Sequence, residues 1–202
     1  SSIIEMQNYP VVQISYDDAL AFANWKGHRL PTEKEWEYAS RGGKIGATYS
    51  WGEQDPKSGI SKANTWQGMF PHENLNHDNY IYSSPVGCFP ANGFGLFDTT
   101  GNVWEWTNDW YHSSYYVDGP DRNPKGPVIS NVKAVHGGSY ATDASHIRPT
   151  YRARDDPYLK GPDVGFRCAC DVLPGTAVQG RSWGQVKRSP EPLVVEDLEV
   201  HP

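Results

Sequence analysis

Sulfur chemistry in this sequence is limited to three cysteines, Cys88, Cys168 and Cys170. An odd number leaves at least one thiol without a partner inside the chain. Cys168 and Cys170 are separated by one residue, and cysteines that close rarely bridge each other, because a disulfide needs a particular separation of its Cα atoms. No two cysteine pairs have the spacing of a zinc site. Cysteine usage therefore does not identify a cellular compartment.

Seven histidines could supply metal ligands or acid–base groups, but none forms an H-x-x-x-H pair. His72 and His77 lie in a polar stretch, where we expect solvated loop histidines. His136 and His146 flank a segment that contains two consecutive glycines. A metal site or an acid–base pair formed by these two histidines is an open alternative.

Charged side chains of both signs gather near the end of the chain. The members of this group are Arg148, Arg152, Arg154, Asp155, Asp156, Asp163 and Arg167. One interpretation is a groove that binds an anion or a peptide. We favour the other, a network of ion pairs that fixes the last loops.

Composition and charge exclude several classes of protein. The chain has 202 residues, a net charge of -6, and abundant Gly (20), Pro (16), Trp (8) and Tyr (12). This mixture favours an α+β domain with little regular secondary structure, in which loops pack on aromatic rings. No basic stripe suggests nucleic acid, and no apolar run suggests a membrane span. Many Asn and Asp residues in loops are compatible with bound calcium.

Two helices near the start of the chain have clear start signals. Ser15 with Asp18 forms a capping box, and Thr32 with Glu35 forms another directly after a proline. Glycines follow both segments and should end them. The first helix should bury Ala19, Leu20, Phe22, Ala23 and Trp25, and the second should bury Trp36 and Ala39.

The rest of the chain is irregular from residue 44 to 138, with strands expected at 11–14, 103–110, 133–136 and 165–170. We divide the sequence into an N-terminal extension at 1–10, a domain at 11–173 and an extended tail at 174–202. The tail is rich in Pro, Gly and charged residues, and such a segment gains order by lying along a partner surface.

Four ordered sequence blocks are more specific than composition. Residues 28–38 read HRLPTEKEWEY, residues 93–98 GFGLFD with 101–106 GNVWEW, residues 137–140 GGSY, and residues 165–169 GFRCA. These blocks resemble the signatures of the formylglycine-generating-enzyme (sulfatase-modifying-factor) family. The resemblance implies the FGE-sulfatase variant of the C-type-lectin-like fold. It begins in mid-domain, so we expect an upstream segment to have been cleaved or to be supplied by another chain.

The same resemblance implies two structural calcium sites, each built from side-chain and backbone oxygens. The first set is Asp98, Gly101, Val103 and Glu105. The second set is Asn64 and Asp78 through side chains, with Thr65 and Tyr80 through carbonyls. Hard oxygen ligands of this kind suit calcium, which accepts six to eight oxygens at irregular angles. An alternative for Glu105 is an ordinary carboxylate at the edge of the core, paired with an arginine.

The resemblance fails at the catalytic positions. Members that make formylglycine hold copper(I) between two cysteines, and this chain has Thr142 and Ile147 there. Soft thiolates select copper(I), whereas a hydroxyl and an alkyl group do not, so we expect no copper and no catalytic residue. The family's oxygen pocket is matched at Trp104 and Ser139, and His146 replaces an aromatic residue.

Two disulfides implied by the family are also missing. Ala23 stands where a cysteine would bridge to Cys168, and Ser40 and Arg152 occupy the two positions of the other bridge. We expect Cys168 to be a buried free thiol.

These observations favour a calcium-stabilised, catalytically degenerate accessory or binding subunit of an extracytoplasmic protein assembly. Its protein partner would contact the tail and the missing front of the domain. Weak loop-type calcium sites need the millimolar ion found outside the cytoplasm, so we expect a periplasmic, secreted or surface-attached protein. One alternative is an oxidoreductase like the pyoverdine-maturation and sulfoxide-synthase relatives, using a different metal. A third is a genuine formylglycine generator.

Overall fold

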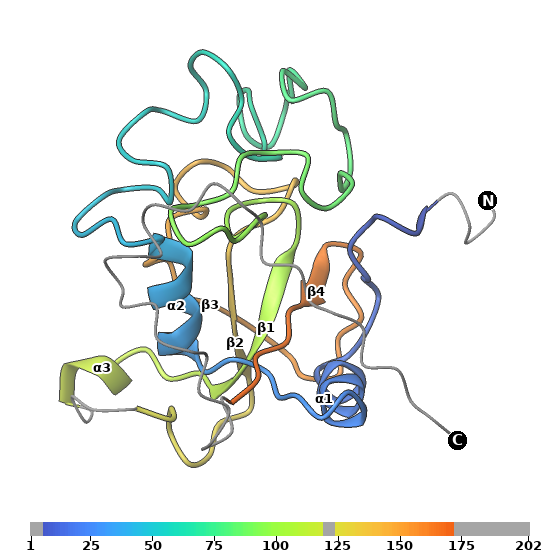
Figure 1. Cartoon of the computed structure of the whole chain (residues 1–202), viewed down its shortest axis with the longest axis vertical. Coiled ribbons are helices and arrows are strands. Elements are labelled where there is room, and N and C mark those ends of the chain that lie inside the picture. Colours follow the sequence, from blue (N-terminus) through green and yellow to red (C-terminus); the bar gives the residue numbers. More distant parts are fainter. Residues whose placement is uncertain (1–5, 119–123, 172–202) are drawn as a thin grey trace, which may run out of the picture. The chain divides into compact units, whose positions relative to one another are not determined.

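The computed structural model describes residues 6–118 and 124–171 (Figure 1). The tail expected at 174–202 and half of the extension at 1–10 lie outside these residues. Within them, no helix is both long and apolar enough to cross a bilayer.

The centre of the fold is a small mixed sheet of four strands in the order β3-β2-β1-β4. β1 (Trp104–Trp110) pairs antiparallel with β2 (Lys133–His136) and parallel with β4 (Val164–Phe166), and β3 (Ala153–Asp155) pairs antiparallel with β2. The strands expected at 103–110 and 133–136 are confirmed. The strand expected at 165–170 is shorter than predicted, continuing only as an isolated bridge between Ala169 and Arg29.

The strand expected at 11–14 does not form. Gln13 adopts a left-handed conformation with φ of 59°, which interrupts an extended run. Its N–H donates to the carbonyl of Gly161, so the segment lies beside the chain that leads into β4 without joining the sheet.

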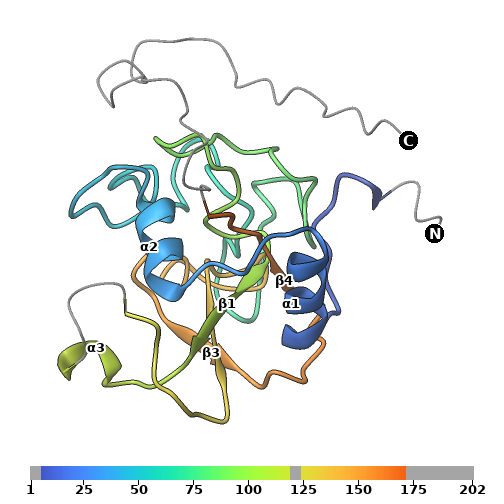
Figure 2. The same cartoon turned by 60° about the horizontal axis from the view of Figure 1, so that its bottom comes forward.

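Both predicted helices form behind their capping boxes. α1 (Tyr16–Trp25) begins after Ser15, and α2 (Glu33–Arg41) begins after Thr32 and ends at Gly42 in the left-handed conformation. Figures 1 and 2 show the two helices on opposite sides of β1, with the irregular loops gathered beyond one end of that strand. A further short helix, α3 (Tyr115–Asp118), follows β1.

α1 buries a narrower face than its apolar residues predicted. Ala19 and Ala23 are fully buried, and Tyr16 packs edge-on against Trp106 at 6.2 Å. Phe22 and Trp25 are exposed and contact each other at the rim, which corrects their predicted burial. The core therefore lies between the small residues of α1 and the indole of Trp106.

α2 is anchored to the sheet by buried charges rather than by apolar contacts alone. Glu33, at its first turn, accepts hydrogen bonds from His136 Nε2 at 2.8 Å and from Arg152 Nε and Nη2 at 2.5 and 3.0 Å. Glu33 and His136 are each 1% exposed. Arg152 thus forms an ion pair, as predicted, but its partner is Glu33 of α2 and not one of the aspartates at 155, 156 and 163 that the sequence suggested. Burial alone would raise the pKa of Glu33, but the hydrogen bonds from His136 and Arg152 hold it at about 2.

A second buried acid, Asp109, lies beside this cluster. Its Oδ2 accepts the N–H of Glu33 at 2.9 Å, while its Oδ1 is buried without a hydrogen-bond partner among the described residues. Burial raises the pKa of Asp109 to about 6, and the charge of Glu33 adds to this shift. The folded state therefore bears the cost of a desolvated carboxylate above that pH.

These two acids predict opposite effects of pH on stability. Glu33 has a lowered pKa in the folded state, so its stabilising contribution is present above about pH 4.5 and is lost toward pH 2. Asp109 has a raised pKa, so stability should fall as pH rises from about 4 to about 6. Asp109→Asn keeps an oxygen for the Glu33 N–H and removes this fall, raising the free energy of unfolding at pH 7 by about 2–3 kcal/mol. Urea unfolding between pH 2 and pH 7 measures both effects.

The matched control is Asp55→Asn, at an exposed aspartate. The free energy of unfolding of this variant should depend on pH in the same way as that of the unmodified protein. A profile for Asp109→Asn that still declines between pH 4 and pH 6 would contradict the assignment of this decline to Asp109.

Two glycines with almost the same backbone angle allow steric strain to be separated from conformational strain. Gly27 has φ of 71° and open space where a Cβ would lie, whereas a Cβ on Gly101, with φ of 74°, would lie 2.2 Å from the carbonyl oxygen of Asn64. Gly27→Ala should cost roughly 1–2 kcal/mol. Gly101→Ala should cost about 3 kcal/mol or more, because the backbone must also move. Denaturant unfolding measures both variants. If they lose the same free energy of unfolding, the close approach of Gly101 to Asn64 does not contribute to the cost.

Candidate functional site

The first predicted oxygen set lies at the turn that leads into β1. Glu105 is 4% exposed and accepts hydrogen bonds from Trp36 Nε1 at 2.6 Å and from Arg167 Nε and Nη2 at 2.5 Å each. These three donors use most of the lone pairs of one carboxylate, and Arg167 balances its charge. In this arrangement Glu105 fits a buried ion pair better than a calcium ion.

Asp98, in the same set, is held differently. Its backbone is left-handed, with φ of 52°, and its Oδ2 accepts the N–H of Gly87 at 2.7 Å. Burial raises the pKa of Asp98, and the nearby charge of Arg167 offsets this only in part. Gly101 and Val103 follow in the same tight turn, as predicted.

The second predicted oxygen set fits a cation better. Asn64 is 1% exposed, and its Oδ1 has no hydrogen-bond partner among the described residues. Thr65 donates its N–H to Asp78 Oδ2 at 2.9 Å, which brings the two chain segments together, and Tyr80 donates its N–H to Asp78 Oδ1 at 3.0 Å. A buried carboxamide oxygen without a donor is therefore next in sequence to a residue that holds a buried acid.

Asp78 lacks a strong counter-ion. Burial raises its pKa, and backbone N–H groups together with the charge of His77 offset this only in part. No ion pair from lysine or arginine reaches Asp78 within residues 6–118 and 124–171. The same residues contain no cluster of three or more His, Cys, Asp or Glu side chains suited to a metal. A bound ion would thus have the carboxylate of Asp78 together with amide and carbonyl oxygens, a mixture that calcium accepts.

Asn102 connects the two sets, a role that the sequence reasoning missed. Its N–H donates to the carbonyl oxygen of Asn64 at 2.8 Å, and its Oδ1 accepts the N–H of Ser84 at 2.9 Å. Asn102 is 2% exposed and left-handed, with φ of 64°. The Gly-Asn dipeptide at 101–102 was the available signal, because both residue types tolerate this conformation.

Thr142 and Ile147 meet across Gly138. A Cβ on Gly138 would lie 2.6 Å from Ile147 Cγ2 and 2.9 Å from Thr142 Oγ1, so both side chains converge on one point of the backbone. Thr142 Oγ1 accepts the N–H of Ser139 at 2.8 Å and donates to the Ser139 carbonyl at 2.9 Å. Ile147 is fully buried. The hydroxyl is thus occupied within its own turn.

The three residues predicted to line the pocket, Ser139, Trp104 and His146, make different contacts. Ser139 is buried and donates to Asp163 Oδ2 at 2.7 Å. Trp104 and His146 both pack against Tyr151, with ring centroids at 6.1 and 4.7 Å. Ser139 is therefore a positioning group within the fold, whereas the two rings form a small aromatic cluster.

The two histidines that could have formed a pair have separate partners. His136 Nε2 is paired with Glu33, and His146 Nδ1 contacts Asp143 Oδ1 at 2.7 Å. His72 and His77 are exposed in a loop, as predicted.

All three cysteines are free and exposed. The prediction that Cys168 is a free thiol is confirmed, but its predicted burial is wrong, because the strand that precedes it ends at Phe166. Partial burial still raises the pKa of the Cys168 thiol. Ser40 and Arg152 stand where the family has its other disulfide. Ser40 donates a hydrogen bond to the carbonyl of Thr99, and Arg152 donates to the carboxylate of Glu33.

Comparison with known proteins identifies a matching family model and several relatives of this chain. A family model described as Sulfatase-modifying factor enzyme 1-like domain matches residues 1–172. The formylglycine-generating enzyme of Streptomyces coelicolor is 42% identical over 184 residues, which cover 89% of this chain and 59% of that protein. The inactive C-alpha-formylglycine-generating enzyme 2 of Bos taurus is 37% identical, with coverage of 84% and 52%. The chain thus spans little more than half the length of these relatives.

Among solved structures, PvdO from Pseudomonas aeruginosa superimposes with a TM-score of 0.66 at 30% identity, covering 79% of this chain and 60% of that one. Sequence and fold lead to the same conclusion. The chain belongs to the family of sulfatase-modifying factor enzyme 1-like domains.

Proposed function

We propose that this chain is a catalytically degenerate, calcium-stabilised member of its family that acts as an accessory or binding subunit of an extracytoplasmic protein assembly. The observation that carries the proposal is the convergence of Thr142 and Ile147 on Gly138. By resemblance, the formylglycine-generating members have two copper-binding cysteines at these positions.

The chemistry of these two side chains argues against oxidation of a substrate thiol. Copper(I) needs soft sulfur ligands, and neither an alcohol nor a hydrocarbon supplies them. Thr142 also satisfies its hydroxyl within the turn, so it offers no free group to a metal or a substrate. The curated relatives include a protein named as inactive, which is compatible with loss of chemistry on a retained fold.

Calcium enters the proposal through the second oxygen set. Asn64 and Asp78 would supply side-chain oxygens, and Thr65 and Tyr80 would supply carbonyls. The orphaned Asn64 Oδ1 and the uncompensated Asp78 support this assignment. At the other set, Asp98, Gly101, Val103 and Glu105 could hold an ion only if Arg167 shared Glu105 with it.

The proposed location and the proposed binding surface rest on separate arguments. Loop-type calcium sites of modest affinity are filled only at the millimolar concentrations found outside the cytoplasm, which supports an extracytoplasmic location. The small mixed sheet with few helices and long loops is compatible with the C-type-lectin-like variant named by the resemblance, and loops of such a fold can serve as a binding surface.

A second candidate is an oxidoreductase that uses another metal. Asp143 fixes His146 through Nδ1, which leaves Nε2 as an available ligand beside Trp104 and Tyr151. Elemental analysis of the purified protein separates the two: about one equivalent of iron or copper supports the oxidoreductase, and calcium alone supports the binding subunit.

Chelation should destabilise the protein if calcium orders these loops. Adding EDTA should lower the melting temperature by several degrees, because a ligand that binds only the folded state stabilises it by mass action. Asp78→Asn should lower the melting temperature in calcium and abolish most of the response to EDTA. Scanning calorimetry with and without calcium measures both.

The matched control is Asp143→Asn, at an acid outside both oxygen sets, which should keep the full response to EDTA. Identical melting curves for the unmodified protein in calcium and in EDTA would remove calcium from the proposal.

Formylglycine formation gives the second test. A peptide containing C-x-P-x-R, incubated with the protein, copper(I) and oxygen, should show no aldehyde above a blank in mass spectrometry. The double variant Thr142→Cys, Ile147→Cys should gain copper(I) binding in a chelator competition, because the two side chains already converge. Aldehyde formed by the unmodified protein would overturn the assignment of a degenerate site.

A further inference from the structure

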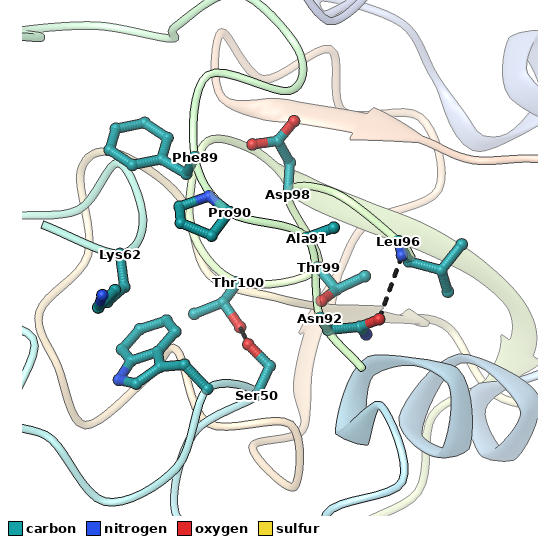
Figure 3. Close-up of a pocket in the computed structure, with 11 residues that line it drawn as sticks. Ser50, Lys62, Phe89, Pro90, Ala91, Asn92, Leu96, Asp98, Thr99 and Thr100 are labelled. Atoms are coloured by element: carbon teal, nitrogen blue, oxygen red, sulfur yellow. Dashed lines mark hydrogen bonds between the residues drawn. The ribbon is translucent and has the colours of Figure 1, made fainter. Parts of the chain in front are cut away.

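A small cavity lies among the loops (Figure 3), and neither Thr142 nor Ile147 lines it. It has a volume of about 40 Å³ and is lined by Ser50, Trp51, Lys62, Phe89, Pro90, Ala91, Asn92, Leu96, Asp98, Thr99 and Thr100. A single water needs about 10–15 Å³ of such space, so the cavity holds roughly three water-sized groups.

Lys62 is the cation of this cavity. It is half-buried, and it makes no hydrogen bond, ion pair or ring contact with any residue in the part of the chain that the structure describes. An anion that reached this ammonium group would form a charge-assisted hydrogen bond with it.

The other polar groups of the cavity differ in what they still offer. Ser50 Oγ and Thr100 Oγ1 lie 2.8 Å apart, so one proton serves the bond between them and the other is free to be donated. Asn92 is fully used, donating to the carbonyls of Ala39 and Ser40 and accepting two backbone N–H groups. The available donors are therefore the ammonium group, one hydroxyl of the Ser50–Thr100 pair and the hydroxyl of Thr99, which also lines the cavity.

The acid of the cavity does not neutralise this lysine. Asp98 is bonded to the N–H of Gly87, and Figure 3 shows Asp98 and Lys62 apart, on different sides of the cavity. The rings of Trp51 and Phe89 complete the lining, and the indole N–H of Trp51 is already donated to the carbonyl of Gln54. An anionic group with an apolar stem would match these walls.

We propose that this cavity binds a carboxylate of a protein partner, with Lys62 as its counter-ion and the Ser50–Thr100 pair as its hydroxyl donor. A carboxylate presents two acceptor oxygens, which can meet an ammonium group and a hydroxyl donor at the same time. The inference rests on the proposed role as a binding subunit and names the chemistry that the partner presents.

Capped tripeptides provide the probe. In calcium-containing buffer, ¹H–¹⁵N spectra of the protein are titrated with three compounds: capped Gly-Glu-Gly, its glutamine counterpart, and acetyl-Gly-Gly with a free carboxyl terminus. The glutamate or the free-carboxylate peptide should shift the indole signal of Trp51 and the amides of Ser50 and Thr100, and the glutamine peptide should not. Which carboxylate binds more tightly distinguishes an acidic side chain from a chain terminus as the source.

Lys62→Met should weaken binding of the preferred carboxylate by about tenfold, because a hydrogen bond to a charged group is lost. Lys62→Arg should retain most of the affinity, and Lys44→Met, at an exposed lysine outside the cavity, should bind as the unmodified protein does. Equal binding by Lys62→Met, equal shifts with the glutamine peptide, or no shift with any carboxylate would each overturn the inference. The response of the melting temperature to EDTA is scored separately, so a failure of the calcium proposal is not mistaken for a failure of this one.

Discussion

The main constraint on this fold is the need to satisfy buried polar groups in a chain with little regular structure. Residues 42–103 contain no helix and only an isolated bridge, yet Asn64, Asp78 and Asn102 are almost fully buried there. Helices and sheets satisfy their own backbone, whereas irregular chain must use side chains for this purpose. Asn102 and Asp78 do so by accepting backbone N–H groups from three loops. Three buried side-chain oxygens of this segment have no hydrogen-bond partner among the described residues, namely Asn64 Oδ1, Asn76 Oδ1 and Ser84 Oγ, and the first of these belongs to the proposed cation site.

α2 shows how a charged contact can occupy the place of a covalent one. By resemblance, positions 40 and 152 would carry a disulfide between α2 and the chain before β3. Here Arg152 reaches the same helix through Glu33, whose burial makes the pairing obligatory, because an unpaired charge at that depth is strongly destabilising. An ion pair of this kind works in a reducing or an oxidising compartment, but it depends on pH, as a disulfide does not. Asp109 adds to this dependence from the neighbouring strand.

Local signals in the sequence predicted the helices and two strands well, since capping boxes and the apolar run at 133–136 act over a few residues. The errors arose where tertiary packing decides. Phe22 and Trp25 were assigned to the core because they are apolar, but only the alanines and Tyr16 of α1 are buried. Leu20 is partly buried against the core, and Phe22 contacts Phe166 of β4 while it stays exposed. β3 was missed because Ala153–Asp155 is short and charged, and Cys168 was misplaced because β4 is short. The oxygen sets required the family resemblance, because their members are up to 16 residues apart in sequence and no local pattern unites them.

Around Gly138, the hydrogen bonds that hold the turn can be distinguished from the two side-chain positions that would carry catalysis in the formylglycine-generating members. A reactive site must hold its groups close together in fixed positions, and the turn at 139–147 still does this with Thr142 and Ile147. The turn is maintained by the Thr142 hydroxyl and by Ser139 bonded to Asp163, none of which involves sulfur. The hydrogen bonds that hold this turn therefore do not depend on cysteines at positions 142 and 147. The proposed binding surface would require the position of the backbone in these loops rather than the reactivity of two side chains.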